Sequence, residues 1–575
     1  MNIAKAARLF SEIENTSSRT SITQLLAHIL KEATPKESKQ LCYLFLGELN
    51  PPYITTQFAI AQKTMVKIVA AVLEETETHV QREMARVGDL GSIIEQGTWR
   101  KTDSLLTVSE VYELLVTLEA LEGTGSQEKK RAHMVSLLHA LDPLSAKYTV
   151  RIVMGKLRLG FSDMTIIDAL SWMVAEDKSL SNDIEQAYNI CADIGLLAHD
   201  LKVHGIKALR SMKIHMGIPI RPAAAERLPD CQSILKKIGP CVAQPKLDGF
   251  RLQVHIDKRT KTSKIHFFSR NLLDMSAMFP EFVAVCEQIQ VSTFIADGEA
   301  MVYDPETYHF LPFQETVKRK RKHGIDAMVS ELPLQLYLFD LLYFDGEDLL
   351  EYSHEKRRAL LQDALRSVKD HRVQVIEEKV IRTAEQLEDY FVEEIEAGLE
   401  GIVVKKKDAP YQAGRRNFNW IKLKYEASSK MEDTLDVVIL GYYPGKGKRA
   451  KLGIGAFLVG IFNPREDCFE TVAKIGTGMS DAQWVDLKAR CDAIQARDKP
   501  HNVVCDKSLY PAVWVDPSIV CEVLADNITV SPVHTAGKKE GANGLALRFP
   551  RFLKYRIDKS FEQTTSYEEL REMIL

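Results

Sequence analysis

Apolar residues recur every three or four positions along roughly the first 210 residues, and period-two alternation is scarce there. Stripes of this kind lie at Val108–Leu121 and Met164–Met173. Another consists of Ile22, Leu25, Leu26, Ile29 and Leu30. A spacing of 3.6 residues places such positions on one face of a helix. The pattern therefore predicts an all-helical region at the start of the chain.

The helical pattern is interrupted at Gly217–Pro229, which contains Pro219, Pro222 and Pro229. Continued helix is not expected here, because proline lacks a backbone N–H and clashes with the preceding turn. We place the first domain boundary at this segment, so the first predicted domain covers residues 1–216.

Strand-like runs begin near Cys241 and are separated by helical stretches at Met278–Ile289 and Glu355–Val368. The predicted strands are Arg251–Ile256, Lys264–Ser269, Thr293–Val302, Leu334–Phe344, Gly401–Lys405 and Trp420–Lys424. Mixed strands and helices are typical of an α+β domain. This second predicted domain covers residues 217–430.

Short strands divided by glycine and proline turns follow residue 431. They are LDVVILGYY, GAFLVGIF, ETVAKIGTG and the segment Val513–Val530. Several short strands in close succession indicate a small β-barrel, such as an oligonucleotide-binding (OB) fold. The expected fold class is thus multidomain α+β: an all-helical N-terminal domain, an α+β domain and an OB-fold barrel at residues 431–575.

Composition narrows the class of protein further. The 575 residues are 45% hydrophobic and 27% charged. No stretch of the sequence approaches the roughly 18 apolar residues that a membrane span needs. The nine cysteines form no CxxC pair, so neither a zinc module nor a disulfide framework is indicated. The N-terminal residues form an amphipathic helix rather than a signal peptide. These features favour a soluble protein of the cytoplasm.

The most informative stretch for chemistry is Gln244–Arg251, with the sequence QPKLDGFR. Pro245 and Gly249 both favour a turn, which would hold Lys246 at a fixed loop end. A lysine amine becomes a covalent nucleophile when its proton is removed, and Arg251 offers a planar fork for a phosphate. For an isolated match of this kind, an ordinary surface lysine in a polar turn is the alternative.

Further motifs follow in a fixed order. They are FSRN with Arg270, FIADGEAM with Glu299, YLFDLLYFDG with Phe339, EGIVVKK with Glu400, and NWIKLK with Lys422 and Lys424. With these motifs, the sequence resembles the covalent nucleotidyltransferases, and specifically the ATP-dependent DNA ligases of archaeal and eukaryotic replicative type. The resemblance extends to Arg82–Gly91, Gly155–Asp163 and Leu547–Lys559, and so covers almost the whole chain.

The resemblance implies a role for each matching residue. Lys246 would attack the α-phosphate of ATP and hold AMP as a phosphoramidate. Phe339 would stack on adenine, although a core phenylalanine in an apolar strand is the alternative. Glu299 would bind the ribose and belong to the metal shell, and Glu400 would be a second metal-binding carboxylate. For both acids, a solvated position at a strand end is the alternative.

Basic residues complete the predicted nucleotide site. Those expected near the phosphates are Arg251, Arg270, Arg416, Lys422 and Lys424. Alternation on a strand puts Lys422 and Lys424 on one face, although a solvated strand edge would also explain them. The resemblance further implies that Arg556 and Lys559 close onto the triphosphate, with a hinge at Tyr425–Glu432.

One position departs from the family pattern. Two residues before the nucleophile the family usually has a glutamate that accepts from the adenine amino group, and here the residue is Gln244. An amide can accept through oxygen but also donate through nitrogen. We therefore expect Gln244 to contact the base and to relax nucleotide choice.

Basic tracts indicate a phosphate-binding surface, although the formal net charge is only −4. They are Lys318–Lys322, Gly401–Lys424, Tyr442–Lys451 and Arg548–Lys559. In the helical region, the loop at Gly123–Arg131 opens a helix that can receive a phosphate, and Lys156 and Arg158 add positive charge. By resemblance, this domain grips duplex DNA across the minor groove.

The resemblance therefore implies a monomeric DNA ligase that seals nicked double-stranded DNA in replication, repair and recombination, using ATP and Mg²⁺ or Mn²⁺. A sliding clamp is a candidate partner, no membrane is expected, and the predicted location is the prokaryotic cytoplasm, at the nucleoid. An RNA ligase or capping guanylyltransferase, and a non-catalytic DNA-binding clamp, are the alternatives. The use of ADP, GTP or NAD and the preferred metal stay open.

Overall fold

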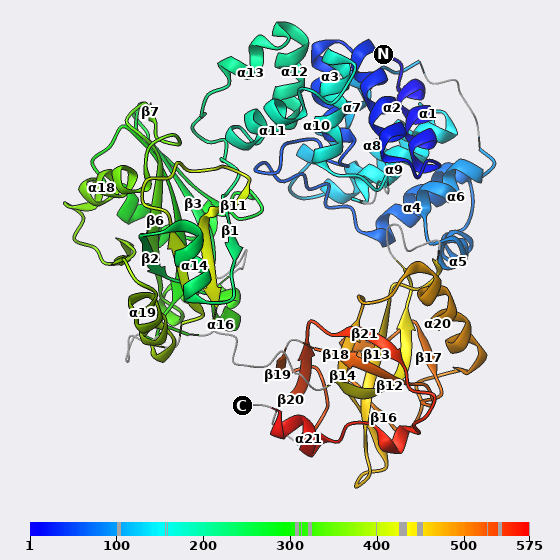
Figure 1. Ribbon diagram of the computed structural model, residues 1–575. Helices are drawn as coiled ribbons and strands as arrows, with labels where there is room; N and C mark the ends of the chain where they lie inside the picture. The colour runs from blue at the N-terminus through cyan, green and yellow to red at the C-terminus, as the bar shows by residue number, and fades with distance from the viewer. Residues whose placement is uncertain are drawn as a thin grey trace. The chain divides into compact units, whose positions relative to one another are not determined.

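The computed structural model describes residues 1–573 apart from 100–104, 156, 158, 305–309, 312, 320–324, 398, 425–433, 446–451, 526 and 539–542 (Figure 1). The chain divides into two compact units, Met1–Lys424 and Tyr425–Leu575. In the described part of the chain, no helix combines the length and the apolar character that crossing a bilayer requires.

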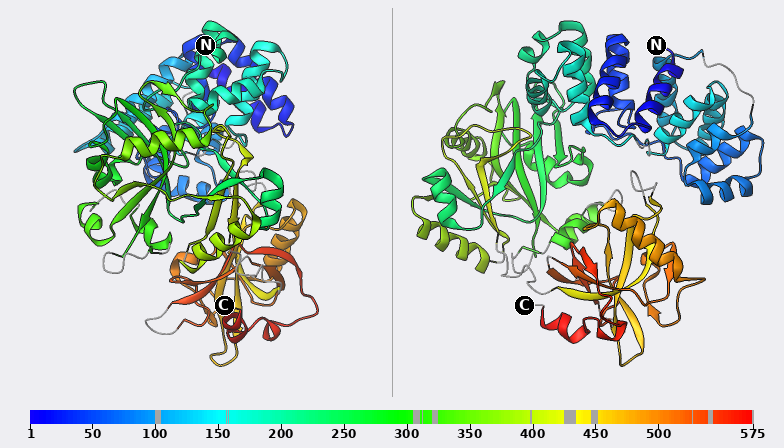
Figure 2. Two further views of the ribbon diagram at one scale, coloured as in Figure 1. Left: turned by 60° about the vertical axis from the view of Figure 1, so that its left-hand side comes forward. Right: turned by 45° about the vertical axis from the view of Figure 1, so that its right-hand side comes forward.

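The N-terminal part of the first unit is helical, as predicted (Figures 1 and 2). Its helices are α1 (Ile3–Glu14), α2 (Arg19–Glu32), α3 (Pro35–Leu44), α4 (Gln62–Leu73), α5 (Glu77–Val87), α6 (Leu90–Gln96), α7 (Val108–Ala120), α8 (Ser126–His139), α9 (Pro143–Val153), α10 (Asp163–Ala175), α11 (Ser181–Ile190), α12 (Ile194–His204) and α13 (Lys207–Ser211). Several begin at side-chain caps: Thr34 and Glu37 form a reciprocal capping box at α3, and Thr107 and Glu110 form another at α7.

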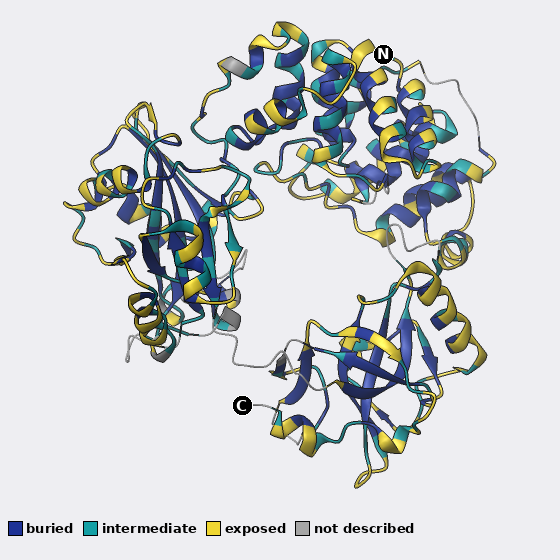
Figure 3. Ribbon diagram, in the orientation of Figure 1, coloured by how far each residue is buried: buried dark blue, intermediate teal, exposed yellow. Residues whose placement is uncertain are grey.

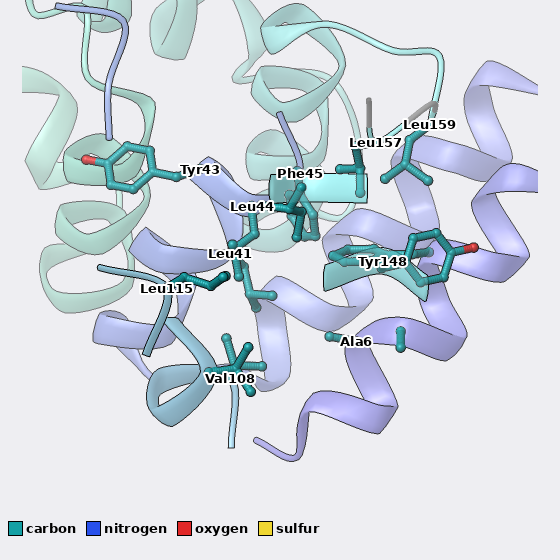
Figure 4. Close-up of a cluster of buried hydrophobic side chains, with 14 of the residues drawn as sticks. Ala6, Leu41, Tyr43, Leu44, Phe45, Val108, Leu115, Tyr148, Leu157 and Leu159 are labelled. Atoms are coloured by element: carbon teal, nitrogen blue, oxygen red, sulfur yellow. The ribbon is translucent and has the colours of Figure 1, made fainter. Parts of the chain in front are cut away.

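Apolar stripes of these helices meet in one continuous core (Figure 4). The ring of Phe10 packs edge-to-face on Phe45 and Tyr148, with centroids 5.8 and 5.2 Å apart. Such pairs are among the favoured aromatic geometries. The amphipathic N-terminus predicted from sequence is thus a buried structural helix, because Ile3, Phe10 and Ile13 all lie inside this core.

Two β-sheets form the rest of the first unit. One has five strands in the order β1 (Ala224–Arg227), β11 (Arg416–Lys424), β10 (Gly401–Lys405), β2 (Cys241–Pro245) and β9 (Lys379–Ile381). The other has the order β4 (Lys264–Ser269), β3 (Phe250–Asp257), β5 (Thr293–Val302), β6 (Leu334–Phe344) and β7 (Glu347–Asp348), with β8 (Val373–Val375) beside β6. The sequence predicted most of these strands to within a few residues.

Helices cover each sheet, and the sheets pack against each other. The apolar side chains of β2, β10 and β11 that include Ala243, Ile402 and Ile421 pack with α14 (Cys231–Ile238) and α19 (Ala384–Glu396). The six-stranded sheet packs with α15 (Pro280–Cys286) and α18 (His354–Leu365). The short helices α16 (Phe313–Lys318) and α17 (Ile325–Glu331) precede β6. Trp420 of β11 and Leu342 of β6 share another buried cluster, which joins the two sheets.

The second unit is built on one large sheet. Its main path runs through β15 (Gln495–Ala496), β17 (Val513–Val515), β12 (Leu435–Tyr443), β13 (Ala456–Asn463), β14 (Cys468–Ile475) and β16 (Val503–Val504), while β18 (Val520–Leu524) pairs with β12 and β21 (Arg551–Tyr555). A separate pair joins β19 (Asn527–Ser531) and β20 (Gly544–Arg548), and α20 (Asp481–Ala493) and α21 (Tyr567–Glu572) complete the unit.

This arrangement agrees with the predicted β-rich character of the C-terminal region, but the described strands do not close into a barrel. Most residues of the central strands β12, β13 and β14 are buried (Figure 3). Helix α20 was not predicted. It buries Trp484, Leu487 and Cys491 against the sheet. Their spacing of three and four residues is the pattern of an amphipathic helix and could have predicted it.

Candidate active site

Lys246 lies on the turn between β2 and β3, as the sequence predicts. Its backbone N–H donates to the carbonyl of Gly401, at 2.8 Å, so the turn is fastened to the start of β10. A Cβ atom at Gly249 would lie 2.1 Å from the carbonyl oxygen of Ala300. The turn therefore needs a glycine for close approach to β5, and this packing fixes where the Lys246 side chain leaves the backbone.

Strand register brings the carboxylate of Glu400 and the amines of Lys246 and Lys424 together at the ends of neighbouring strands. In the five-stranded sheet, Gly401 pairs with Lys424 and Ile402 pairs with Pro245. Glu400, which directly precedes β10, therefore lies between Lys246 and Lys424, and its carboxylate binds both amines. Burial opposes the ionised form of Glu400, but hydrogen bonds and charge from the two lysines outweigh it and lower the pKa of this carboxyl group.

The inner face of the five-stranded sheet, which is the face turned away from α14 and α19, carries two of the predicted cations. Ile421 and Leu423 point toward the helices, so Lys422 and Lys424 lie on the inner face, as predicted. Partial burial lowers the pKa of Lys422, and so does repulsion from Lys424, Arg416, Lys246 and Arg270. Lys422 is therefore influenced by four other predicted site cations.

Glu299 lies on the neighbouring sheet, where β5 pairs with β3. It is opposite Arg251 in the register, and its carboxylate accepts from the backbone N–H of Gly249 at 3.2 Å. Burial raises the pKa of Glu299 to about 7, against the opposing charges of Arg251 and Lys246. A carboxyl group that titrates near neutrality beside a lysine is typical of a functional site.

Arg251 is held by protein groups. Its guanidinium donates to the carboxylate of Asp297 at 2.8 Å and to the carbonyl of Ala223 at 2.7 Å. It also lies 5.4 Å from the centre of the Phe339 ring. The structure thus gives Arg251 an architectural role between β3 and β5, while the predicted phosphate contact stays a prediction.

Phe339 lies between the two sheets and is half-buried. Its ring is 5.9 Å from that of Trp420 in an edge-on arrangement, and the amine of Lys405 lies 4.9 Å from its centre. Phe339 packs against two apolar clusters and keeps some exposure, while stacking on adenine stays a prediction.

Comparisons with known proteins agree along the whole chain. Residues 222–424 match the family described as "ATP dependent DNA ligase domain", residues 3–171 match "DNA ligase N terminus", and residues 450–559 match "ATP dependent DNA ligase C terminal region". The chain belongs to the family of ATP-dependent DNA ligases.

Full-length relatives support the same assignment. The chain is 41% identical to "Probable DNA ligase" of Dictyoglomus thermophilum, over 100% of this chain and 97% of the relative. It is 36% identical to "DNA ligase 1" of Methanosarcina acetivorans, over 99% and 98%. The solved structure "Pmar-Lig_PreS3" has a TM-score of 0.55 at 17% identity and covers 96% of this chain and 99% of that one, which indicates a shared fold.

Gln244 is buried in this ligase and faces a residue that the sequence analysis did not single out. Its amide nitrogen donates to the carboxylate of Glu378 at 2.8 Å. Glu378 in turn contacts His354 and Arg358. Sequence reasoning missed Glu378 because its contact with Gln244 joins two segments that are far apart in the chain. The one signal in the sequence was an acidic residue directly before the strand β9.

Other predicted residues of the ligase lie elsewhere or outside the described part. Arg556 and Lys559 belong to the second unit, where both bind Asp436 and Arg556 also binds Asp558. The predicted hinge at Tyr425–Glu432 lies outside the described residues. The same holds for Lys156, Arg158, residues 320–322 and residues 446–451, which belong to three predicted basic segments. In the described part of these segments, Arg319 is buried and paired with Glu281, so it is not part of the predicted phosphate-binding surface.

Proposed function

We propose that this enzyme seals 5′-phosphate/3′-hydroxyl nicks in duplex DNA through a lysine–AMP intermediate and adenylated DNA. The observation that carries the proposal is the position of Lys246, which is fastened on a turn, hydrogen-bonded to Glu400, and close to Lys422 and Lys424. A nucleophile, a proton acceptor and phosphate-binding charge are the parts that nucleotidyl transfer requires.

The first step would be adenylation of Lys246. Glu400, already hydrogen-bonded to the amine, would accept its proton, and the free amine would attack the α-phosphate of ATP. A P–N bond forms, the bond to the β-phosphate breaks and pyrophosphate leaves. Lys422, Lys424, Arg270 and Arg416 would stabilise the negative charge that grows on the phosphate oxygens.

The nucleotide would bind between the two sheets. Phe339 would stack on adenine, Gln244 would contact its edge and Glu299 would bind the ribose, with Arg251 supporting both sheets. Arg556 and Lys559 of the second unit stay predictions from the family resemblance, which assigns them to the triphosphate.

The carboxylates near Lys246 suit a divalent cation. Among the described residues, no group of three or more His, Cys, Asp or Glu side chains is arranged to hold a metal ion. Mg²⁺ usually takes only one or two carboxylates and completes its shell with water and substrate phosphates. Glu299 and Glu400 fit that requirement, and Mg²⁺ or Mn²⁺ bound there would neutralise phosphate charge.

The remaining steps would transfer AMP to the 5′-phosphate at the nick and then join the strands, when the 3′-hydroxyl displaces AMP. The helical region would hold the duplex through its phosphates, so affinity should fall steeply with salt and vary little with sequence. The domain limits at 216 and 430, a C-terminal OB fold, a monomeric state, a sliding-clamp partner and a location in the prokaryotic cytoplasm at the nucleoid belong to the same proposal.

The decisive experiment is incubation with ATP and Mg²⁺ followed by intact-mass measurement. Wild type should gain the mass of one AMP, and Lys246→Ala should gain none while remaining folded. An unchanged adduct on Lys246→Ala would exclude the proposed nucleophile.

A nick-sealing assay would then separate the enzyme alternatives. Sealing of nicked DNA in preference to RNA ends is expected, and trials with ATP, ADP, GTP and NAD would define the nucleotide. A protein that binds DNA but forms no adduct would instead support the non-catalytic clamp.

A further inference from the structure

Backbone register places Glu378 beside Gln244. Strands β2 and β9 are antiparallel, with Val242 opposite Val380 and Ala243 opposite Lys379. Continuing that register by one residue sets Gln244 opposite Glu378. Side chains of directly opposed residues project on the same side of a sheet, which explains the 2.8 Å contact between the amide nitrogen and the carboxylate.

The carboxylate decides which way the Gln244 amide faces. An ionised carboxylate only accepts hydrogen bonds, whereas an amide has an NH₂ donor on one branch and an oxygen acceptor on the other. The NH₂ must therefore face Glu378, because the reverse orientation would set two acceptor oxygens against each other. The amide oxygen is left as the acceptor on the opposite branch.

Buried neighbours hold Glu378 in place and ionised. Its carboxylate accepts from His354 at 2.8 Å and lies 3.3 Å from Arg358. Burial opposes the charge, but the hydrogen bond from His354 and nearby positive charges outweigh it and lower the pKa of Glu378. The other ring nitrogen of His354 lies 3.6 Å from Asp340, the residue that follows Phe339 in β6.

This chain of contacts links the two parts of the proposed base site. Asp340 accepts from Arg357 at 2.7 Å, and Lys405 donates to the backbone carbonyl of Phe339 at 2.9 Å. Gln244 lies on the inner face of its sheet, two residues before Lys246, so both side chains leave on the side of the nucleotide site.

We propose that Glu378 is a positioning residue that holds the Gln244 amide with its oxygen toward the base, so that this ligase accepts a 6-aminopurine nucleotide and rejects a 6-oxopurine one. The inference rests on the proposed function, namely that the space between the sheets binds ATP. A freely turning amide would relax nucleotide choice, as expected from the sequence; an amide fixed by Glu378 keeps the choice strict.

Inosine triphosphate is the sharpest probe, because it differs from ATP in having a carbonyl instead of an amine at C6 and a proton on N1. The measurement is the rate of adduct formation on Lys246 with each nucleotide, followed by intact mass. Wild type should prefer ATP by about 100-fold or more, because a carbonyl facing the fixed oxygen leaves two acceptors unpaired.

Three variants test the positioning role. Glu378→Gln frees the amide to turn, so the ATP preference should fall about tenfold, toward inosine triphosphate. Gln244→Glu sets two carboxylates side by side and should slow adduct formation with ATP at least tenfold. The double variant Gln244→Glu/Glu378→Gln exchanges the two groups and should recover both the ATP rate and the preference. Glu377→Gln, which changes an exposed neighbour, is the matched control.

The outcomes separate this inference from the function it rests on. Absence of any adduct on wild type would contradict the proposed function itself. A normal wild-type adduct with an unchanged nucleotide preference in Glu378→Gln would overturn the positioning role. If Glu378→Gln does not fold, the double variant decides: no recovery of ATP preference relative to Gln244→Glu overturns the inference as well.

Discussion

Two groups of carboxylates in the first unit make similar ion pairs in different surroundings. At the front of the site, Glu400 binds Lys246 and Lys424, and the three side chains keep 25%, 19% and 33% of their surface exposed. Behind it, Asp340 binds Arg357 with both side chains fully buried. We call Glu400, Lys246 and Lys424 the front pair group, and Asp340 with Arg357 the rear pair.

The difference lies in what happens when a partner leaves. Water reaches the front pair group, so a phosphate or a metal ion can replace a partner there at small cost. A charge of the rear pair that loses its partner stays buried and uncompensated, which costs several kcal/mol. The front pair group is therefore suited to chemistry, and the rear pair to holding the strand that carries Phe339.

Breaking the rear pair should give the largest loss of stability. Asp340→Asn removes the charge that compensates Arg357, and Lys405 also lies 3.8 Å from this carboxylate. We expect the free energy of unfolding to fall by about 3–5 kcal/mol. Urea denaturation of the full chain measures it. A loss below about 1 kcal/mol would show that the rear pair is not structural.

Removing the front carboxylate should affect chemistry far more than stability. Glu400→Gln takes away the proposed acceptor for the Lys246 proton and the shared partner of both lysines. Adduct formation with ATP should slow about 100-fold, equivalent to about 2.7 kcal/mol in the barrier. The unfolding free energy should change by less than about 1 kcal/mol. Single-turnover adduct formation and denaturation of one preparation test both statements.

The sequence predicted the elements that carry both groups but not the contacts within the rear pair. Four strand predictions, including Thr293–Val302 and Leu334–Phe344, match the observed bounds, because alternating or continuous apolar runs mark strands directly. Lys246 and Glu400 were predicted because each lies in a short sequence motif, QPKLDGFR and EGIVVKK. The contact between Gln244 and Glu378 depends on the pairing of β2 with β9, and pairing between strands far apart in sequence leaves no local pattern.

A third group in this unit, His255, is buried and uncharged, and it makes the stability of the unit depend on pH. His255 accepts from the Gly217 N–H at one ring nitrogen and lies 3.0 Å from the Gln253 side-chain oxygen at the other. Burial lowers the pKa of His255 to about 3. The unfolded chain therefore takes up a proton first as pH falls, and stability that is complete above about pH 6.5 is lost toward pH 3.

The expected loss from His255 is about 1.4 kcal/mol per pH unit, or about 2–3 kcal/mol between pH 6.5 and 4.5. Unfolding free energies of wild type and His255→Gln at the two pH values measure it. The variant should lose less stability than wild type over this interval. Equal losses would mean that His255 is not the group responsible. Asp340 does not contribute over this interval, because its pKa is well below 3.8 and it stays ionised there.

The smallest effect should come from Lys379, which adjoins Glu378 in sequence but is exposed. Its amine pairs with Glu393, and the two side chains keep 50% and 60% of their surface exposed. It also lies 4.6 Å from the ring of Tyr390. Lys379→Met should change the unfolding free energy by less than about 1 kcal/mol and leave adduct formation and ATP preference unchanged. A loss comparable to that of Asp340→Asn would show that proximity along the chain, rather than burial of the pair, sets the cost.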